Sequence, residues 1–481
     1  MPPSYAGDEL ASALRSIVGD KYFLDEPTAM IPYVRDSGIF EGVPPSFVVR
    51  PGSVEEVIEV IKVANKYKVP IRIRGGGSSY TAAVLPQERR EILLDTTRLN
   101  RIIEIDEESN SVTVEAGINW SKLLYELKKR GLMTFGGPGS LYTATVGGSV
   151  SCASLGAGMS KYGGIGDWIL GLQVVLPTGE VIRTGSGINP FAKKFCRYGL
   201  GPDLTGLFVG DHGIFGVKTE VTLRTYLLPE VTGEVEYAFQ SEEDAFNAFR
   251  EMANVNEMAD TLRLYDADWV RGVSRSFHYL EGAKSLVLGY ISTYSNKLYE
   301  AQKELFDAIA RKHGGRETEG KYAKYVHETH HDSYYLIRRT HGIAISAYGQ
   351  APLGRVLEII KSYRKFLRDN QEVVKNYTSY AGIMVTLVSK RHANVYLAIF
   401  FPWHLDSDPK ARQTILGFWD RCIDFFIEQG GIHYWVGKLI GDRIYLKVPK
   451  VQHDFLKTLK KALDPNCILN PGLFLITREG P

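Results

Sequence analysis

The segment HETHH, residues 327–331, has the spacing of a zinc-binding helix. In the pattern H-E-x-x-H, two histidines one helical turn apart hold the metal, and the glutamate acts as general base. We expect a helix over residues 321–339. No third ligand is evident, because Ile337 stands where the longer form of the motif has a histidine. The alternative interpretation is a polar, histidine-rich helix face beside a cavity.

A glycine run after a predicted strand offers different chemistry. The segment RGGGSS, residues 74–79, ends a predicted β-α-β unit, whose helix starts with the capping box of Ser53 and Glu56. Three successive glycines let backbone N–H groups turn inward and bind a phosphate, and Ser78 and Ser79 add hydroxyl donors. The spacing matches neither the dinucleotide fingerprint G-x-G-x-x-G nor a P-loop. A plain glycine-rich turn is the alternative.

Small residues run almost without a break from Thr143 to Gly158. Such a tract cannot fill a core, but it lets a large flat group lie against the backbone. Hairpins are predicted around EESNS and VVLPTGEVI, and a helix in NWSKLLYELKKRG has Ser121 near its start and Gly131 as a C-cap candidate. Glycine crowding eases after Leu228, where we predict a domain boundary.

Length and composition exclude several classes of protein. A chain of 481 residues is too long for one core, and its 57 basic residues nearly balance 55 acidic ones without a long basic block, so we expect no nucleic-acid partner. The four cysteines form no C-x-x-C pair, as is typical of free thiols in a reducing compartment. Neither a signal peptide nor an apolar run of about 18 residues is evident, so we expect a cytoplasmic protein, with peripheral contact at the inner face of the membrane left open.

Five segments, taken in order, resemble the FAD-linked oxidases of the vanillyl-alcohol oxidase / p-cresol methylhydroxylase type. They are RGGGSS, GPGS…TATVGGSVSCAS, VVLPTGEVI, PDLTGLFVGDHGIFGVKTEVTL and DPNCILNPG. The resemblance implies an α+β fold with a two-lobed FAD-binding domain of the p-cresol methylhydroxylase (PCMH) type in residues 1–227, its core at 42–227. An α+β, ferredoxin-like cap would follow in 228–440, and a C-terminal segment, 441–481, would pack back on the FAD domain.

The resemblance also implies where FAD binds. Loop 74–79 would hold the pyrophosphate, residues 138–154 would lie along the phosphates and the isoalloxazine, and Lys438 would stabilise the reduced flavin. Some members tether FAD through a histidine in the glycine-rich loop, but Ser78 or Ser79 stands there, so non-covalent FAD is expected. The predicted FAD-binding residues are Arg74, Gly75, Gly76, Gly77, Ser78, Ser79, Pro138, Gly139, Thr143, Thr145, Gly147, Gly148, Ser151, Cys152, Ser154, Gly216, Val217, Lys438 and Asn470.

The metal-binding motifs of the family's hydroxy-acid branch look altered, so we predict no metal site. SKRHANVY, residues 389–396, has Ser389 and Tyr396 where that branch has histidines. GIHYWVGK, residues 431–438, has His433 and Tyr434 in place of a Glu-His pair. IHYWVGK also resembles the HHHGVGK of alkyl-dihydroxyacetonephosphate synthases, and FCRYGLGPDLTGLF is similar to the phenol-oxidising branch.

Three residues are the catalytic candidates. YYLIRRTHG resembles a Trp-x-x-Arg segment of hydroxy-acid dehydrogenases, which makes Arg338 a candidate for binding a substrate carboxylate through its planar, charged fork. Oxidation of an alcohol needs a base for the hydroxyl proton, and His433 is predicted in that role, with Tyr434 orienting the hydroxyl. A surface ion pair for Arg338 and a structural role for His433 are the alternatives.

The resemblance therefore implies an FAD-dependent dehydrogenase or oxidase that acts on the CH–OH group of a small 2-hydroxy acid, of the D-lactate type. Hydride would pass to flavin N5 and electrons onward to a quinone, a dye or a carrier protein. A phenolic-alcohol oxidase and an alkyl-glycerone-phosphate synthase-like flavoenzyme are alternatives, and a zinc hydrolase using HETHH is a remote one. We expect a homodimer.

Overall fold

Two compact units make up the chain in the computed structural model. The first comprises residues 1–154, 165–227 and 435–481, and the second comprises residues 155–164 and 228–434. The structure describes residues 5–199, 201–329, 342–344 and 347–476. The second unit resumes at Leu228, whereas residues 435–440, assigned to the cap from the sequence, belong to the first unit.

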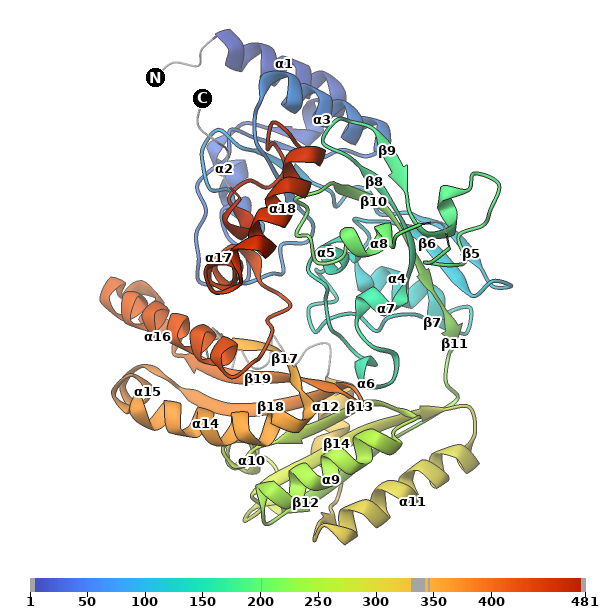
Figure 1. The fold of residues 1–481 in the computed structure, drawn as a ribbon, viewed down its shortest axis with the longest axis vertical. Coiled ribbons are helices and arrows are strands. Elements are labelled where there is room, and N and C mark those ends of the chain that lie inside the picture. Colours follow the sequence, from blue (N-terminus) through green and yellow to red (C-terminus); the bar gives the residue numbers. More distant parts are fainter. Residues whose placement is uncertain (1–4, 200, 330–341, 345–346, 477–481) are drawn as a thin grey trace. The chain divides into compact units, whose positions relative to one another are not determined.

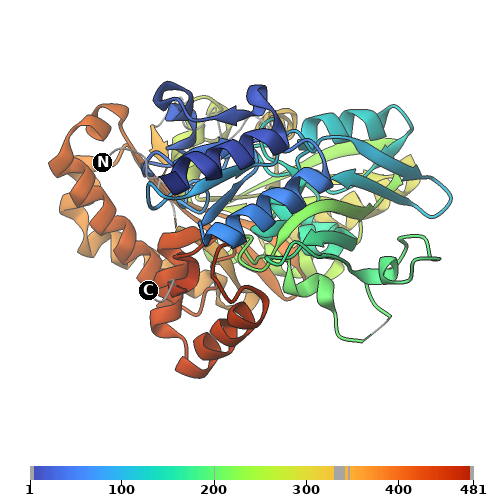
Figure 2. The ribbon, with the colours of Figure 1, turned by 90° about the horizontal axis from the view of Figure 1, so that it is seen from above.

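The first unit contains a four-stranded sheet in the order β1–β2–β4–β3. The parallel strands β2 and β3 flank β4, and helix α3 (Val54–Tyr67) makes the crossover that parallel strands need. The predicted capping box starts this helix, because the Ser53 side chain accepts from the N–H of Glu56 and the Glu56 carboxylate accepts from the N–H of Gly52 at 2.7 Å. Helix α1 (Tyr5–Val18) lies beside α3 (Figure 2). The strands are β1 (Phe23–Leu24), β2 (Phe47–Val49), β3 (Ile71–Arg74) and β4 (Ile92–Asp95).

A five-stranded antiparallel sheet, ordered β5–β6–β10–β8–β9, forms the other lobe of the first unit. Both predicted hairpins are present, as β5–β6 and β8–β9. Helix α4 (Trp120–Lys128) is capped by Asn119, with Ser121 in its first turn, and its C-cap is Lys129 rather than the predicted Gly131. The strands are β5 (Ile102–Asp106), β6 (Ser111–Glu115), β8 (Ile169–Val175), β9 (Val181–Arg183) and β10 (Val217–Arg224).

Short elements complete the first unit. Strands β7 (Leu132–Met133) and β11 (Tyr226–Leu227) pair, and the remaining α-helices are α2 (Pro27–Met30), α5 (Val146–Ser151), α7 (Ile165–Trp168), α8 (Leu204–Leu207), α17 (Gly437–Lys447) and α18 (Lys450–Leu463).

The second unit is built on one antiparallel sheet in the order β15–β12–β14–β13–β18–β19–β16, and β17 also pairs with β19 (Figure 1). The strands are β12 (Val231–Phe239), β13 (Ala259–Tyr265), β14 (Ser285–Thr293), β15 (Arg316–Glu317), β16 (Ile343–Ala344), β17 (Ala347–Pro352), β18 (Tyr380–Ser389) and β19 (His392–Phe401). The helices are α6 (Met159–Tyr162), α9 (Glu242–Val255), α10 (Ala267–Ser274), α11 (Asn296–Lys312), α12 (Lys321–Glu328), α14 (Val356–Asp369), α15 (Gln371–Tyr377) and α16 (Pro409–Glu428).

This sheet consists of two ferredoxin-like halves. In the first, the chain runs β12, α9, β13, β14, α11 and β15, and the strands lie in the order β15–β12–β14–β13. The second repeats the pattern with β17, α14, β18, β19 and α16, after which Ile432 bridges to Gln350 on β17. The halves join where β13 pairs with β18. The predicted α+β fold with a ferredoxin-like cap is therefore confirmed.

One face of the second unit's sheet is aliphatic, whereas the other, the polar face, carries polar side chains among apolar ones such as Leu288 and Met384. Side chains alternate between faces along a strand. On β18 one face carries Ile383, Val385 and Leu387, whereas Thr386, between them, points to the other. Both faces are largely buried, so the polar side chains on one face require an explanation other than solvent contact.

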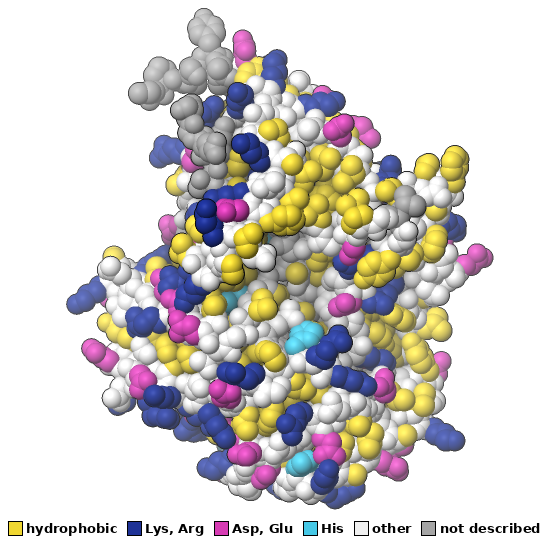
Figure 3. All heavy atoms as spheres, viewed as in Figure 1, with side chains coloured by type: hydrophobic (Ala, Val, Ile, Leu, Met, Phe, Trp, Pro, Cys, Tyr) yellow, Lys and Arg dark blue, Asp and Glu magenta, His cyan; other side chains and the backbone are white. Residues whose placement is uncertain are grey.

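The surface of the described chain carries charges of both signs. Basic and acidic side chains are interspersed on the face drawn in Figure 3, and neither sign forms a continuous field there. Among the described residues, no helix combines the length and the apolar composition that crossing a bilayer would require.

Candidate functional site

The glycine-rich loop after β3 packs directly against the small-residue tract. A Cβ added at Gly76 would lie 1.6 Å from the carbonyl oxygen of Thr143, and one added at Gly75 would lie 2.3 Å from Oγ1 of Thr145. Gly77 takes the left-handed conformation, with φ of 66°. These glycines are needed because two backbone segments meet here. The structure thus brings together the two segments predicted to bind the phosphates of FAD.

The small-residue tract forms a turn and then a short helix. Thr143 and the following residue donate N–H groups to Ser140, just after Pro138 and Gly139. Thr145 caps α5, accepting the N–H of Gly148 through its hydroxyl at 3.2 Å. A Cβ at Gly147 would lie 2.7 Å from that of Ala116 on the neighbouring segment, so this side of α5 is held against the five-stranded sheet.

Arg74 supplies the positive charge of this loop. Its Nη2 donates to the carbonyl of Pro32 at 3.2 Å, and its guanidinium lies 5.6 Å from the ring centre of Tyr33. Its buried Nη1 has no hydrogen-bond partner within the described residues. A buried guanidinium nitrogen without a partner beside a glycine loop is suited to an anionic pyrophosphate. The residues present therefore fit FAD, and Arg74 with loop 75–79 would hold its phosphates.

Asp36 faces the same loop. Its carboxylate accepts N–H groups from Gly38 at 2.8 Å and from Ala82 at 3.0 Å. Burial raises the pKa of Asp36 to about 6, and these two hydrogen bonds and the charge of Arg74 oppose the rise. Asp36 thus joins its own segment to the residues that follow the loop, and sequence reasoning missed it because no motif marks it.

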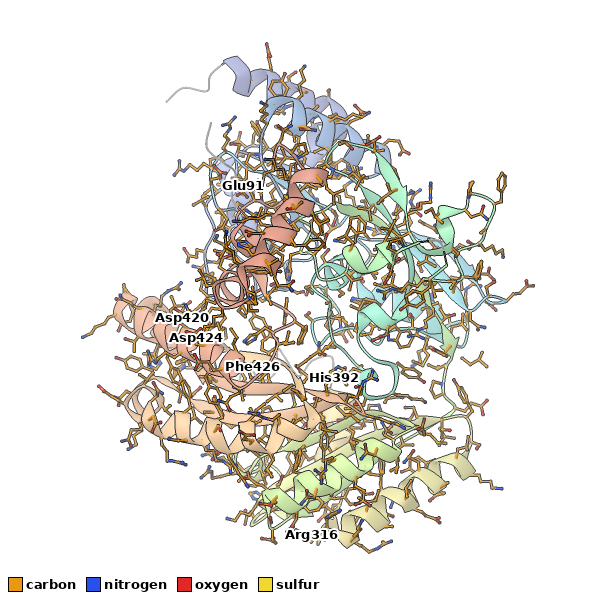
Figure 4. The ribbon with its side chains drawn as sticks, in the orientation of Figure 1. Glu91, Arg316, His392, Asp420, Asp424 and Phe426 are labelled. Carbon is orange, nitrogen blue, oxygen red and sulfur yellow. The ribbon has the colours of Figure 1, made fainter. Side chains whose placement is uncertain are left out.

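The C-terminal segment returns to β3 through Asn470. The Asn470 side chain accepts the N–H of Ile73 at 2.8 Å and donates to the carbonyl of His212 at 2.6 Å. A buried ion pair reinforces this junction, since Arg72 contacts Glu91 (labelled in Figure 4) and donates to the carbonyl of Pro471. Asn470 therefore joins three segments of the predicted FAD site, and its direct contact with FAD stays a prediction.

Gly216, Val217 and Lys438 also lie in the first unit. A Cβ at Gly216 would lie 2.4 Å from Cγ1 of Val174, so close packing against β8 explains this glycine. Val217 is buried in the core beneath α3. Lys438 donates to the carbonyl of Gly472 at 3.0 Å and lies 3.6 Å from Asp442.

A buried polar cluster beside α5 was not predicted from the sequence. Lys218 on β10 forms an ion pair with Asp211, and burial lowers the pKa of Lys218 and raises that of Asp211. Burial also lowers the pKa of His212 to about 3, and its Nε2 has no hydrogen-bond partner in the described part of the chain. Burial raises the pKa of the Cys152 thiol to about 12, and the charge of Lys218 opposes this rise. The available signal was a lysine inside an otherwise buried strand, VKTEV.

His433 and Tyr434 lie on opposite faces of the second unit's sheet. His433 Nδ1 contacts the carbonyl of Tyr348 at 2.6 Å, and its ring centre lies 5.0 Å from that of Phe426 on α16 (labelled in Figure 4). Because a carbonyl only accepts, the proton lies on Nδ1 and the lone pair on Nε2. Burial lowers the pKa of His433 to about 4, so the ring is neutral at pH 7.

Tyr434 shares the polar face of the sheet. Its ring centre lies 5.7 Å from that of Tyr348, whose ring also lies 5.7 Å from that of Tyr396. It packs against Leu155 and Met159, which lie in residues 155–164, the short early segment that belongs to the second unit. The structure therefore does not bring the predicted catalytic pair together on one face, and the role of His433 as base stays a prediction. Arg338 lies outside the described residues.

The zinc motif is only partly within the described chain. Helix α12 ends at Glu328, and His330 and His331 lie outside the described residues. His327 Nδ1 contacts Glu234 at 2.6 Å, and its ring stacks on Tyr290 with centres 4.6 Å apart. Ser389 contacts His392 Nδ1 at 2.7 Å (His392 is labelled in Figure 4). Within the described ranges, no group of three or more histidine, cysteine or acidic side chains is placed to hold a metal.

Comparison with known proteins identifies the family. Residues 45–185 match the model of an FAD binding domain, and residues 228–473 match that of the FAD linked oxidases, C-terminal domain. The chain is 24% identical to the glycolate oxidase subunit GlcD of Bacillus subtilis (strain 168), with 96% of each chain covered. It is 27% identical to the mitochondrial D-lactate dehydrogenase [cytochrome] of Arabidopsis thaliana, over 96% of this chain and 79% of that protein.

Two further similarities concern other branches. The chain is 32% identical to the alkyldihydroxyacetonephosphate synthase of Trypanosoma brucei brucei, over 53% of this chain and 40% of that protein. The structure of p-cresol methylhydroxylase with substrate bound superposes with a TM-score of 0.82 at 19% identity, covering 99% of this chain and 98% of that one. The predicted PCMH-type fold and the FAD cofactor are thereby confirmed. With both of its units matched by family models, this chain belongs to the FAD linked oxidases.

Proposed function

We propose that the protein oxidises the CH–OH group of a small 2-hydroxy acid, with D-lactate as the favoured substrate. The observation that carries this proposal is similarity over almost the whole chain to a glycolate oxidase subunit and to a D-lactate dehydrogenase. Both of those proteins are named for 2-hydroxy acids that differ by one methyl group. A quinone, a dye or a carrier protein such as a cytochrome would receive the electrons.

The reaction converts CH–OH to C=O, so the substrate loses a hydride from carbon and a proton from oxygen. FAD, when bound, supplies the hydride acceptor. Tyr434 lies on the polar face of the second unit's sheet, and we assign its hydroxyl to orienting the substrate hydroxyl. His433 is enclosed between β17 and α16, and its bond to Tyr348 holds the segment that carries Tyr434 against β17.

A dye-linked steady-state assay tests the proposal. The purified FAD-loaded protein is given D-lactate, glycolate, L-lactate and 4-hydroxybenzyl alcohol, each with an artificial electron acceptor. We expect turnover with D-lactate or glycolate and an oxo acid as the product. Turnover with the phenolic alcohol alone would overturn the proposal in favour of a phenolic-alcohol oxidase.

An alkyl-glycerone-phosphate synthase-like reaction is the second candidate. The 32% identity to the trypanosomal synthase and the resemblance of IHYWVGK to a synthase motif favour it. This reaction would form an alkyl-dihydroxyacetone phosphate with no net redox change, so it would not reduce a dye. Formation of an alkyl-dihydroxyacetone phosphate, with no dye reduction by any hydroxy acid, would favour this candidate.

A further inference from the structure

A row of directly paired residues crosses the sheet of the second unit. Directly opposite residues on neighbouring strands point to the same face. The row therefore presents its side chains on one face, which is the face of Tyr348 and Tyr434. Its members are Glu236, Leu288, Arg263, Thr386, Asn394 and Gln350, on β12, β14, β13, β18, β19 and β17.

The centre of this row is both polar and buried. Arg263, Thr386 and Asn394 are 7%, 1% and 7% exposed, and Arg263 Nη1 donates to the hydroxyl of Tyr265 at 3.5 Å. Their sequence neighbours on the opposite face, such as Val385 and Val395, are aliphatic and buried. Burying a charged or polar side chain is unfavourable unless it is matched by other polar groups. Packing alone therefore does not explain why the strands place these three side chains side by side.

Glu236, at the other end of the row, has all of its carboxylate contacts within its own surroundings. The Glu236 carboxylate accepts from the hydroxyl of Tyr279 at 2.9 Å, from the N–H of Ala323 at 2.7 Å and from the hydroxyl of Thr318. Leu288 lies between Glu236 and Arg263 in the row. Glu236 is thus fully engaged by its own surroundings and is separated from Arg263 by an apolar side chain.

Three polar atoms in or beside the centre of the row have no hydrogen-bond partner among the described residues. Thr386 Oγ1, Asn394 Oδ1 and the hydroxyl of Tyr290 are buried without a hydrogen-bond partner in the described part of the chain. Tyr290 pairs with Thr261, two residues from Arg263 on β13, and so belongs to the same face. Buried polar atoms are normally satisfied, so these three point to a bound group that completes them.

We propose that Arg263, Thr386 and Asn394 form a subsite that binds the carboxylate and the hydroxyl of a 2-hydroxy acid. Arg263 supplies a permanent positive charge and a planar fork of donors, which suits a carboxylate. The Thr386 hydroxyl donates a hydrogen bond to the same carboxylate, and Asn394 Oδ1 accepts a hydrogen bond from the substrate hydroxyl. This inference rests on the proposed function, and it places the carboxylate recognition on β13 in addition to the predicted Arg338.

The subsite makes a prediction about specificity. Propane-1,2-diol shares the carbinol and the methyl group of D-lactate but has no carboxylate. The wild-type protein should therefore prefer D-lactate strongly, and Arg263→Met should reduce that preference. A merely structural arginine would lower the activity on both substrates by the same factor and leave the preference unchanged.

Oxalate binding tests the subsite without turnover. Oxalate is an unreactive dianion that resembles the acid, and its affinity for the FAD-loaded protein is measured by isothermal titration calorimetry. We expect Arg263→Met to weaken oxalate about 30-fold or more, as loss of a charge-assisted bond does. Thr386→Val keeps the shape and removes the hydroxyl, so we expect a loss of about five- to tenfold. Arg250→Met, which removes an exposed arginine on α9, is the matched control and should leave the affinity unchanged.

The outcomes separate the subsite from the proposed function. Wild-type oxalate affinity in a folded, FAD-loaded Arg263→Met protein would overturn the subsite, even if D-lactate is oxidised. If Arg263→Met does not fold, wild-type affinity in Thr386→Val would overturn it instead. Arg263-dependent oxalate binding without oxidation of any hydroxy acid would support the subsite and overturn the proposed function.

Discussion

The two units offer different kinds of atoms to a ligand. In the first, the candidate FAD site is made largely of backbone, because the loop at Gly75 and Gly76 packs against Thr143 and Thr145 with no space for side chains. In the second, the candidate substrate site is made of side chains that paired strands place in a row, with Arg263 at its centre. A backbone site needs glycines at fixed positions, whereas a side-chain site needs only the correct register between strands.

The largest expected effect is the loss of FAD when the backbone site is filled. In Gly76→Ala the added Cβ would lie 1.6 Å from the carbonyl oxygen of Thr143, so the two segments must separate. We expect the purified variant to retain less than about a tenth of the wild-type FAD, as measured by its visible absorbance relative to protein. Gly166→Ala, where the nearest atom would lie at 3.5 Å, is the control and should stay loaded. Full FAD content in Gly76→Ala would contradict the conclusion that FAD binding needs close backbone packing at Gly76.

The buried ion pair between Lys218 and Asp211 should contribute to stability rather than bind FAD. Lys218→Met leaves Asp211 buried without its partner, which typically destabilises by about 3–5 kcal/mol. Chemical denaturation measures this change, and Lys193→Met, which removes a largely exposed lysine paired with Asp106, should change the unfolding free energy much less. If Lys218→Met lost FAD while keeping its wild-type unfolding free energy, Lys218 would be an FAD ligand rather than a structural residue.

His433 should make the second unit sensitive to acid. The unfolded chain takes up a proton on this ring below its ordinary pKa of 6.5, whereas the folded chain does so only near 4. Acid therefore favours unfolding, and stability contributed by the neutral ring is full above pH 6.5 and lost as the pH falls toward 4. At about 1.4 kcal/mol per pKa unit, this loss amounts to about 3 kcal/mol.

Denaturation midpoints between pH 4 and pH 7 check this expectation. His433→Gln should show a shallower pH dependence than the wild-type protein. His278→Gln, which changes an exposed histidine, should follow the wild-type curve. Identical curves for His433→Gln and the wild-type protein would mean that His433 titrates normally in the fold.

Tyr434→Phe should give the smallest effect. Removing one hydroxyl that orients the substrate is expected to lower kcat by about tenfold, with FAD content unchanged. Steady-state kinetics with D-lactate measures this change, and Tyr325→Phe in the same unit is the control. An unchanged kcat in Tyr434→Phe would contradict the assignment of the Tyr434 hydroxyl to orienting the substrate.

The sequence predicted the backbone site better than the side-chain site, for a physical reason. Glycines at 75–77 and the capping box at Ser53 and Glu56 are local signals, so the end of β3 and the start of α3 could be placed from residue types alone. The meeting of Gly76 with Thr143 needed a resemblance to a family, because 67 positions separate these residues along the chain.

The row in the second unit could not be predicted from one sequence. Arg263, Thr386 and Asn394 come from three strands, and only the pairing register shows that they share a face. His433 and Tyr434 lie on opposite faces because they are neighbours on an extended segment, which Ile432 joins to Gln350. Residues 155–164 continue the small-residue tract, yet they belong to the second unit because Ser160 bonds to Leu387 and Leu262.

The most direct test of the account is the visible spectrum of the wild-type protein under anaerobic conditions, before and after addition of D-lactate. We predict a yellow protein whose flavin absorbance is lost on addition and returns when an electron acceptor is supplied. A protein that carries FAD but keeps the oxidised spectrum with D-lactate, glycolate and every other 2-hydroxy acid tested would contradict the proposed function.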